Sequence, residues 1–146
     1  MSNPRTRVLF AEDDADTREL VAYVLTQNNC EIVTTGSYDG ALLLAKTDSF
    51  DLYILDNWLT DKSGMDLCLR LREIDPKTPI LFYSGATLEE DRQRALSCGA
   101  QVYLTKPANN DELVSAVLRL TGGSGVLPRR SPGCSWNCGI ANNVRL

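Results

Sequence analysis

The feature that most constrains this chain is a run of four apolar or aromatic residues, 52–55, followed directly by Asp56 and then by turn-forming residues. A short apolar run closed by turn formers is typical of a strand buried on both faces of a parallel sheet. Open α/β sheets bind their ligands beyond the carboxyl ends of the strands. Asp56 is therefore a candidate functional residue, although a carboxylate in this place could equally cap a helix or a turn.

The rest of the chain alternates short apolar runs with stretches of helical periodicity. We expect strands at 8–11, 32–33, 52–55, 79–84 and 102–105, and helices at 14–28, 37–47, 63–73, 87–97 and 109–120. Asp14 or Asp16 could cap the first helix, Thr87 to Glu90 has the spacing of a capping box, and Asn109 could cap the last helix. Such alternation on short connections predicts an α/β fold, a doubly wound (βα)5 five-stranded parallel sheet in the flavodoxin-like order 2-1-3-4-5.

Length and composition predict one ordinary globular domain. The chain has 146 residues, of which 43% are hydrophobic and 23% charged. Its apolar runs are far shorter than a membrane span, and its N-terminus lacks the apolar core of a signal peptide, so we expect a cytoplasmic protein without membrane contact. The glycines of residues 122–125 interrupt the periodicity, which predicts a domain at 1–121 and a flexible or irregular tail at 122–146.

Charge argues against a nucleic-acid partner for the domain. The formal net charge is −4, and three arginines without any acid in residues 122–146 leave −7 for residues 1–121. We therefore expect no direct binding of nucleic acid. The chain has five cysteines and no histidine, which argues against a disulfide framework and against a metal site at Cys134 and Cys138.

The expected topology brings acids from two strands together. Glu12 and Asp13 follow the first strand and Asp56 follows the third, and these strands flank the switch point of a 2-1-3-4-5 sheet. Clustered carboxylates suit Mg²⁺, while Ser84 and Lys106 at the ends of strands four and five add a hydroxyl and a positive charge. Such a site can accept and hold a phosphoryl group. Each residue alone has an ordinary structural explanation, such as a cap, a first-turn acid or a solvated lysine; the convergence of four strands favours a site.

The order Glu12-Asp13, Asp56, Ser84 and Lys106-Pro107 resembles the receiver domain of response regulators in two-component signalling, the CheY-like superfamily. The resemblance covers residues 7–121. Gly64, eight residues after Asp56, the segment Cys98-Gly99-Ala100 and the segment from Tyr103 to Pro107 support it.

The resemblance implies roles for seven residues. Asp56 would be the phosphoacceptor, supplied by a phosphohistidine of a sensor histidine kinase or phosphotransfer protein. Mg²⁺ (or Mn²⁺) would be bound by Asp13, Asp56 and the backbone carbonyl of Trp58, with Glu12 acting through water. Ser84 and Lys106 would contact the phosphoryl oxygens. Tyr103 would be the switch that turns inward when Ser84 moves and so alters the face of helix 4, strand 5 and helix 5, where a downstream protein or a second copy binds. Self-phosphotransfer and slow autodephosphorylation are expected, but no enzymatic turnover.

Two departures from the family pattern lead to further expectations. Thr60 stands where the family usually has proline, so we expect a looser turn after Asp56. Trp58 is large for its position, and we expect its indole to shield the acyl phosphate from water.

Three alternatives remain at this point. A flavodoxin-like cofactor binder would need N–H donors after the first strand, where this chain has acids. An aspartate-nucleophile phosphatase would resemble Asp-x-Asp, whereas Trp58 cannot transfer protons. A receiver that acts as an unphosphorylated scaffold would show no phosphate adduct on Asp56.

Overall fold

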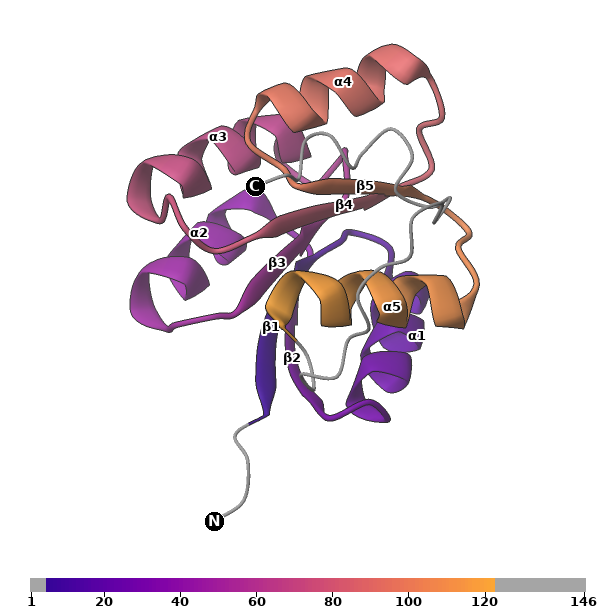
Figure 1. Cartoon of the computed structure of the whole chain (residues 1–146). Helices are drawn as coiled ribbons and strands as arrows, with labels where there is room; N and C mark the ends of the chain where they lie inside the picture. The colour runs from indigo at the N-terminus through magenta and orange to yellow at the C-terminus, as the bar shows by residue number, and fades with distance from the viewer. Residues whose placement is uncertain (1–4, 123–146) are drawn as a thin grey trace.

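Residues 5–122 of the computed structural model form one five-stranded parallel sheet covered by helices on both faces (Figure 1). The strands are β1 (Thr6–Ala11), β2 (Cys30–Thr35), β3 (Leu52–Leu55), β4 (Ile80–Ser84) and β5 (Val102–Thr105). The helices are α1 (Ala15–Thr26), α2 (Tyr38–Thr47), α3 (Gly64–Ile74), α4 (Glu89–Ser97) and α5 (Asn110–Thr121). The order β2-β1-β3-β4-β5 confirms the predicted fold.

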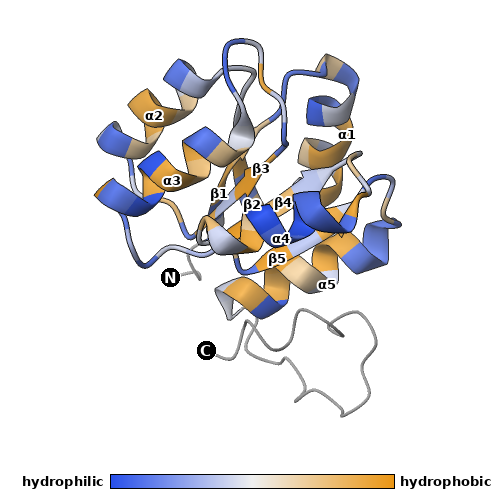
Figure 2. Cartoon of the chain, turned by 90° about the horizontal axis from the view of Figure 1, so that it is seen from above, coloured by the Kyte–Doolittle hydropathy of each residue, from blue (hydrophilic) through white to orange (hydrophobic). Residues whose placement is uncertain are grey.

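Each face of the sheet has its own apolar core, because successive strand side chains point to opposite sides. Val8 and Phe10 of β1 belong to the core under α1 and α5. Leu9 and Ala11 belong to the other core, under α2, α3 and α4. Figure 1 shows the same division, and Figure 2 shows the apolar strands in the middle with polar residues on the outer helix surfaces. Burial on both faces explains why β3 and β4 have no polar residue before their ends.

The strand register places four strand ends at one edge of the sheet. Ala11 pairs with Leu55 and Leu55 pairs with Phe82, while Ser84 pairs with Thr105. The residues that follow β1, β3 and β5 therefore emerge beside one another, next to Ser84 at the end of β4. We call this the carboxyl edge and the opposite one the amino edge.

Polar groups at the amino edge are tied into one network around Arg72. The Arg72 guanidinium donates to the carbonyl oxygens of Thr78 (2.6 Å), Asp75 (3.1 Å) and Gly99 (2.9 Å from Nη2). Its Nη2 also donates to Oε1 of Gln101 at 2.9 Å. This network joins the end of α3 to the starts of β4 and β5, so its role is structural.

The helix caps confirm two predictions and correct one. Asp14 caps α1 by accepting from Thr17 N at 2.9 Å, and Asn109 caps α5. The capping box at Thr87 to Glu90 is wrong, because α4 begins at Glu89 after Leu88, which makes no side-chain cap bond. The Glu89 carboxylate accepts from Arg92 and Gln93, at the (i, i+3) and (i, i+4) positions of its own helix.

Other differences from the sequence predictions come from solvent-exposed positions. Strand β2 runs over Cys30–Thr35 because all six residues pair with β1, including polar ones on the outer side of an edge strand. Leu20 and Leu69 fit the helical pattern but lie outside the core, at 57% and 51% exposure.

The domain boundary and the tail are only partly covered by the structure. Helix α5 ends at Thr121, and the C-cap that follows is Gly122, whose φ of 80° lies in the left-handed region that favours glycine. The predicted tail otherwise lies outside the described residues, as do Cys134 and Cys138. No helix within residues 5–122 is long and apolar enough to cross a membrane.

Candidate functional site

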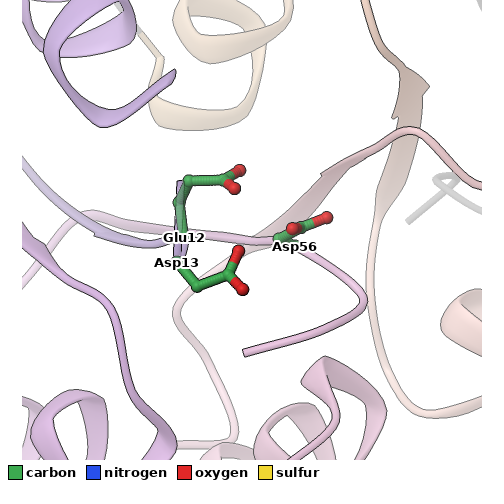
Figure 3. A group of neighbouring side chains, drawn as sticks. All are labelled: Glu12, Asp13 and Asp56. Carbon is green, nitrogen blue, oxygen red and sulfur yellow. The ribbon is translucent and has the colours of Figure 1, made fainter. Parts of the chain in front are cut away.

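Three carboxylates meet at the carboxyl edge, from the ends of neighbouring strands β1 and β3 (Figure 3). One oxygen each from Glu12, Asp13 and Asp56 lies within 4.8 Å of the other two. Glu12 and Asp56 are buried, at 1% and 8% exposure, while Asp13 is exposed. The sheet ladder fixes these positions, because Asp56 N donates to Ala11 O at 3.1 Å. The cluster is thus rigid on the inside and open to solvent at Asp13.

Lys106 brings a positive charge into this cluster from the end of β5. Its Nζ lies 2.7 Å from Glu12 Oε1 and 3.6 Å from Asp56 Oδ2. Its backbone N–H donates to Ser84 O at 2.8 Å, which continues the β4–β5 ladder. Lys106 therefore lies beside both buried acids, at the edge where the sequence predicted a positive charge; its contact with phosphoryl oxygens stays a prediction.

Burial and mutual charge shift the pKa values of the Glu12–Lys106 pair. The pKa of Glu12 is raised to about 7: burial raises it most, the hydrogen bond from Lys106 acts against burial, and the charge of Asp56 adds to the rise. Burial acts to lower the pKa of Lys106, but the hydrogen bond to Glu12 and the charge of Asp56 outweigh it and raise that pKa. Lys106 is therefore cationic at neutral pH.

The donor set fits a small divalent cation. Carboxylate oxygens are the ligands that Mg²⁺ prefers, and it commonly keeps several waters beside one or two carboxylates. Both Glu12 oxygens already have donors, because Oε1 accepts from Lys106 and Oε2 accepts from Asp14 N at 3.2 Å. Asp13 and Asp56 are thus better placed for direct ligation, and Glu12 for contact through water.

Ser84 at the end of β4 and Tyr103 in β5 both form hydrogen bonds with Ala86. Ser84 is buried, and its Oγ accepts from Ala86 N at 3.1 Å. Tyr103 is also buried and donates its hydroxyl proton to Ala86 O at 2.8 Å, with its ring stacked on Phe82 at 5.9 Å between centroids. Burial raises the pKa of the Tyr103 hydroxyl. The aromatic side chain thus already points inward.

The loop after Asp56 folds back tightly. Gly64 N donates to Asn57 O at 2.7 Å, and a Cβ on Gly64 would lie 1.8 Å from Asp56 O. Only glycine allows this approach, which explains the spacing noted in the sequence. The Trp58 side chain in this loop is 68% exposed, and its shielding of an acyl phosphate stays a prediction, which autodephosphorylation of Trp58→Asn would test.

The expected looseness of the turn at Thr60 is wrong. Thr60 donates twice to Gly36 O, from its backbone N at 3.2 Å and from Oγ1 at 2.9 Å. Asp61 Oδ1 then accepts from Tyr38 N at 2.7 Å, at the start of α2. Proline could make neither Thr60 bond, so threonine ties this turn to α2 instead of loosening it.

Sequence reasoning missed Asn57, which is 5% exposed. A usable indication was present in the strand alternation. Tyr53 and Leu55 face the core under α2, α3 and α4, and Asn57 continues that alternation two residues further.

Comparisons with known proteins agree on one family. The sequence model of the response regulator receiver domain matches residues 8–118. The cell cycle response regulator CtrA of Brucella ovis is 36% identical over 111 residues, which is 76% of this chain and 48% of that protein. The chain therefore spans about half the length of the curated relatives it matches.

Two solved structures are similar to this chain in fold and, to a lesser degree, in sequence. The receiver domain of the Francisella response regulator 1452 aligns with a TM-score of 0.75 and 28% identity, over 82% of this chain and 97% of that one. The chemotaxis protein CheY4 of Vibrio cholerae aligns with a TM-score of 0.76 and 27% identity, over 80% and 98%.

Proposed function

The chain belongs to the response regulator receiver domain family of two-component signalling, and from this premise we propose that Asp56 is its phosphoacceptor. The observation that carries the proposal is the meeting of Asp56 with Glu12, Asp13 and Lys106 at one edge of the sheet. Receiver domains are signalling domains, and the donor would be a phosphohistidine on a sensor histidine kinase or phosphotransfer protein.

The two oxygens of Asp56 are not equivalent. Oδ1 accepts from Asn57 N at 2.8 Å, whereas Oδ2 faces Lys106 Nζ at 3.6 Å. We assign the attack to Oδ2: its bond to phosphorus forms as the phosphorus–nitrogen bond of the phosphohistidine breaks, and the electron pair returns to the imidazole, which then takes a proton from solvent. Lys106 would stabilise the negative charge on the transferred group.

Asp13, Asp56 and the Trp58 carbonyl would hold Mg²⁺ or Mn²⁺, with Glu12 acting through water. When bound, such an ion neutralises charge on the phosphoryl oxygens. The exposure of Asp13 leaves that side of the cluster accessible from solvent, and the buried Glu12 keeps Lys106 beside the phosphoacceptor.

Ser84 would complete the site by turning its hydroxyl toward a phosphoryl oxygen. To do so it would give up the bond from Ala86 N, in the loop before α4. Tyr103 bonds to the same residue through Ala86 O. Both contacts of this loop would thus respond to phosphorylation and change the α4–β5–α5 face, to which a downstream protein or a second copy of the chain would bind. Direct nucleic-acid binding by the acidic domain is not expected.

The test is incubation with acetyl phosphate and Mg²⁺, followed by intact-mass measurement. We expect a single phosphate adduct on the wild-type chain, and none on Asp56→Asn or in the presence of a chelator. Asp61→Asn is a matched control, because this carboxylate lies in the same loop but caps α2. An adduct that survives Asp56→Asn would refute the proposal. Cleavage of p-nitrophenyl phosphate at about 1 per second or faster would favour a phosphatase.

A further inference from the structure

Asn57 is a buried polar residue that the proposed function leaves unassigned. The described residues contain four buried polar side chains, and Glu12, Asp56 and Ser84 belong to the site above. Asn57 is the fourth, at 5% exposure. Burying an amide costs free energy unless it is hydrogen-bonded, so the partners of this side chain decide what it contributes.

Asn57 connects the phosphoacceptor to the switch tyrosine. Its backbone N–H donates to Asp56 Oδ1 at 2.8 Å, and its side-chain Nδ2 donates to Tyr103 Oη at 3.3 Å. Its backbone carbonyl oxygen accepts from Gly64 N at 2.7 Å, so both backbone polar groups of Asn57 are hydrogen-bonded. A displacement of Asp56 can therefore reach Tyr103 through one residue, without passing through Ser84.

The hydrogen-bond arithmetic fixes the orientation of the amide. The single hydroxyl proton of Tyr103 goes to Ala86 O, so this hydroxyl can only accept from Asn57. Nδ2 must therefore face the tyrosine, and Oδ1 has no hydrogen-bond partner within residues 5–122. An unpartnered buried oxygen costs stability that a leucine of similar shape would not. The hydrogen bond to Tyr103 is the interaction that asparagine makes here and leucine could not make.

We propose that Asn57 is a positioning residue that holds Tyr103 in its inward position before phosphorylation. The proposal rests on the proposed role of Tyr103 as the switch. Asn57 also lines a pocket of about 250 Å³ beside Asp91 and Arg94 of α4, so its surroundings are not closed on the α4 side. Loss of the Asn57 bond favours the outward position of Tyr103, because the hydroxyl then loses the donor that links it to the loop after Asp56.

The experiment follows Tyr103 by ¹⁹F NMR in the full chain labelled with 3-fluorotyrosine, without any phosphoryl donor. The Tyr103 resonance is assigned by its loss in Tyr103→Phe. For Asn57→Leu we expect the outward population to rise about fivefold, as for the loss of one ordinary hydrogen bond. Asn28→Leu is the matched control, because it removes an amide bond of 2.8 Å to Val24 O in α1, away from the site. An unchanged Tyr103 spectrum in Asn57→Leu, or an equal change in Asn28→Leu, would overturn the proposal.

A double-mutant cycle separates positioning from simple packing. The free energy of unfolding is measured for Asn57→Leu, Tyr103→Phe and the double mutant; a coupling is expected if the bond is real, and additive effects would contradict it. The spectrum of unphosphorylated protein is independent of the acetyl phosphate test. A wild-type chain that takes no phosphate would refute the proposed function alone, whereas a normal adduct with an unchanged spectrum would refute the role of Asn57 alone.

Discussion

The two edges of the sheet both carry polar clusters, but they differ in how completely the polar groups are satisfied. At the amino edge, Arg72 donates to three carbonyls and one amide oxygen, and the Asp75 carboxylate accepts from Tyr53 Oη at 2.8 Å and Thr78 Oγ1 at 2.7 Å. At the carboxyl edge, Asp56 Oδ2 has its cation only at 3.6 Å, and Asn57 Oδ1 has no partner within the described part of the chain.

This difference distinguishes a cluster that stabilises from one that is ready to bind. Saturated hydrogen bonds gain little from a ligand, whereas crowded carboxylates gain from any cation placed among them. Substitutions at one edge at a time test this difference, with the free energy of unfolding and the effect of Mg²⁺ as the measured quantities.

The largest effect is expected for Arg72→Ala, which removes the centre of the amino-edge network. We expect the free energy of unfolding to fall by about 3 kcal/mol, since three part-buried carbonyls and the Gln101 side chain lose their donor. Arg70→Ala is the control: Arg70 lies on the same helix, but its ion pair is with Glu73 on the surface, so a loss below about 0.5 kcal/mol is expected. Urea denaturation measures both. Equal losses would show that the network contributes nothing special.

Asp75→Asn should cost about 2 kcal/mol at pH 7, because it weakens hydrogen bonds to a charged acceptor. Partial burial acts to raise the pKa of Asp75, but hydrogen bonds from Thr78 and Tyr53 outweigh it and hold the pKa below its usual value. A depressed folded pKa gives stability that is present above the unfolded pKa and lost as pH falls through the folded one. The wild type and Asp75→Asn should therefore converge in acid, and a constant gap between pH 7 and pH 3 would contradict this cause.

Mg²⁺ should stabilise the carboxyl edge by about 1.4 kcal/mol when its free concentration is tenfold above its Kd. Asp13→Asn should remove this gain while changing the metal-free stability by less than about 0.5 kcal/mol, because Asp13 is exposed. Thermal unfolding with and without Mg²⁺ measures both quantities. Asp16→Asn, in the first turn of α1, serves as the control acid, and a Mg²⁺ gain that survives Asp13→Asn would argue against the site.

The smallest effect is expected for Thr60→Pro, at about 1 kcal/mol, because it removes both bonds to Gly36. Thr60→Val keeps the backbone bond and should lose roughly half as much. If Thr60→Pro leaves the free energy of unfolding unchanged or raises it, the Thr60 hydrogen bonds do not stabilise the turn at the carboxyl edge.

What the sequence could predict depended on where each interaction lies. Buried strands such as β3 can be recognised in the sequence as apolar runs. Because parallel strands end at one edge of a sheet, this was enough to predict that Glu12, Asp56 and Lys106 lie close together. Edge strand β2 was predicted too short, because three of its six residues, Glu31, Thr34 and Thr35, are polar, and two of these, Glu31 and Thr34, are exposed. The Arg72 network was invisible because its acceptors are mostly backbone carbonyls, which every sequence has.

Asn57 was missed for a related reason. Its partner Tyr103 is 46 positions away, and an asparagine after a strand is ordinarily a turn residue. In the sheet, β3 pairs with β1 and β4, and Tyr103 lies one strand further on β5, so the contact between the two side chains follows only from the fold. The roles of the seven site residues remain predictions that the experiments above decide.

One contact of the loop after Asp56 provides a remote reporter. Asp61 accepts from the backbone N–H of Tyr38, 23 positions earlier, so the first turn of α2 is completed by a carboxylate from the loop that follows the proposed phosphoacceptor. Exchange of that amide proton with deuterated solvent would quicken whenever the loop pulls away. Hydrogen exchange at Tyr38 would thus report on movement of the loop without a substitution in the acid cluster.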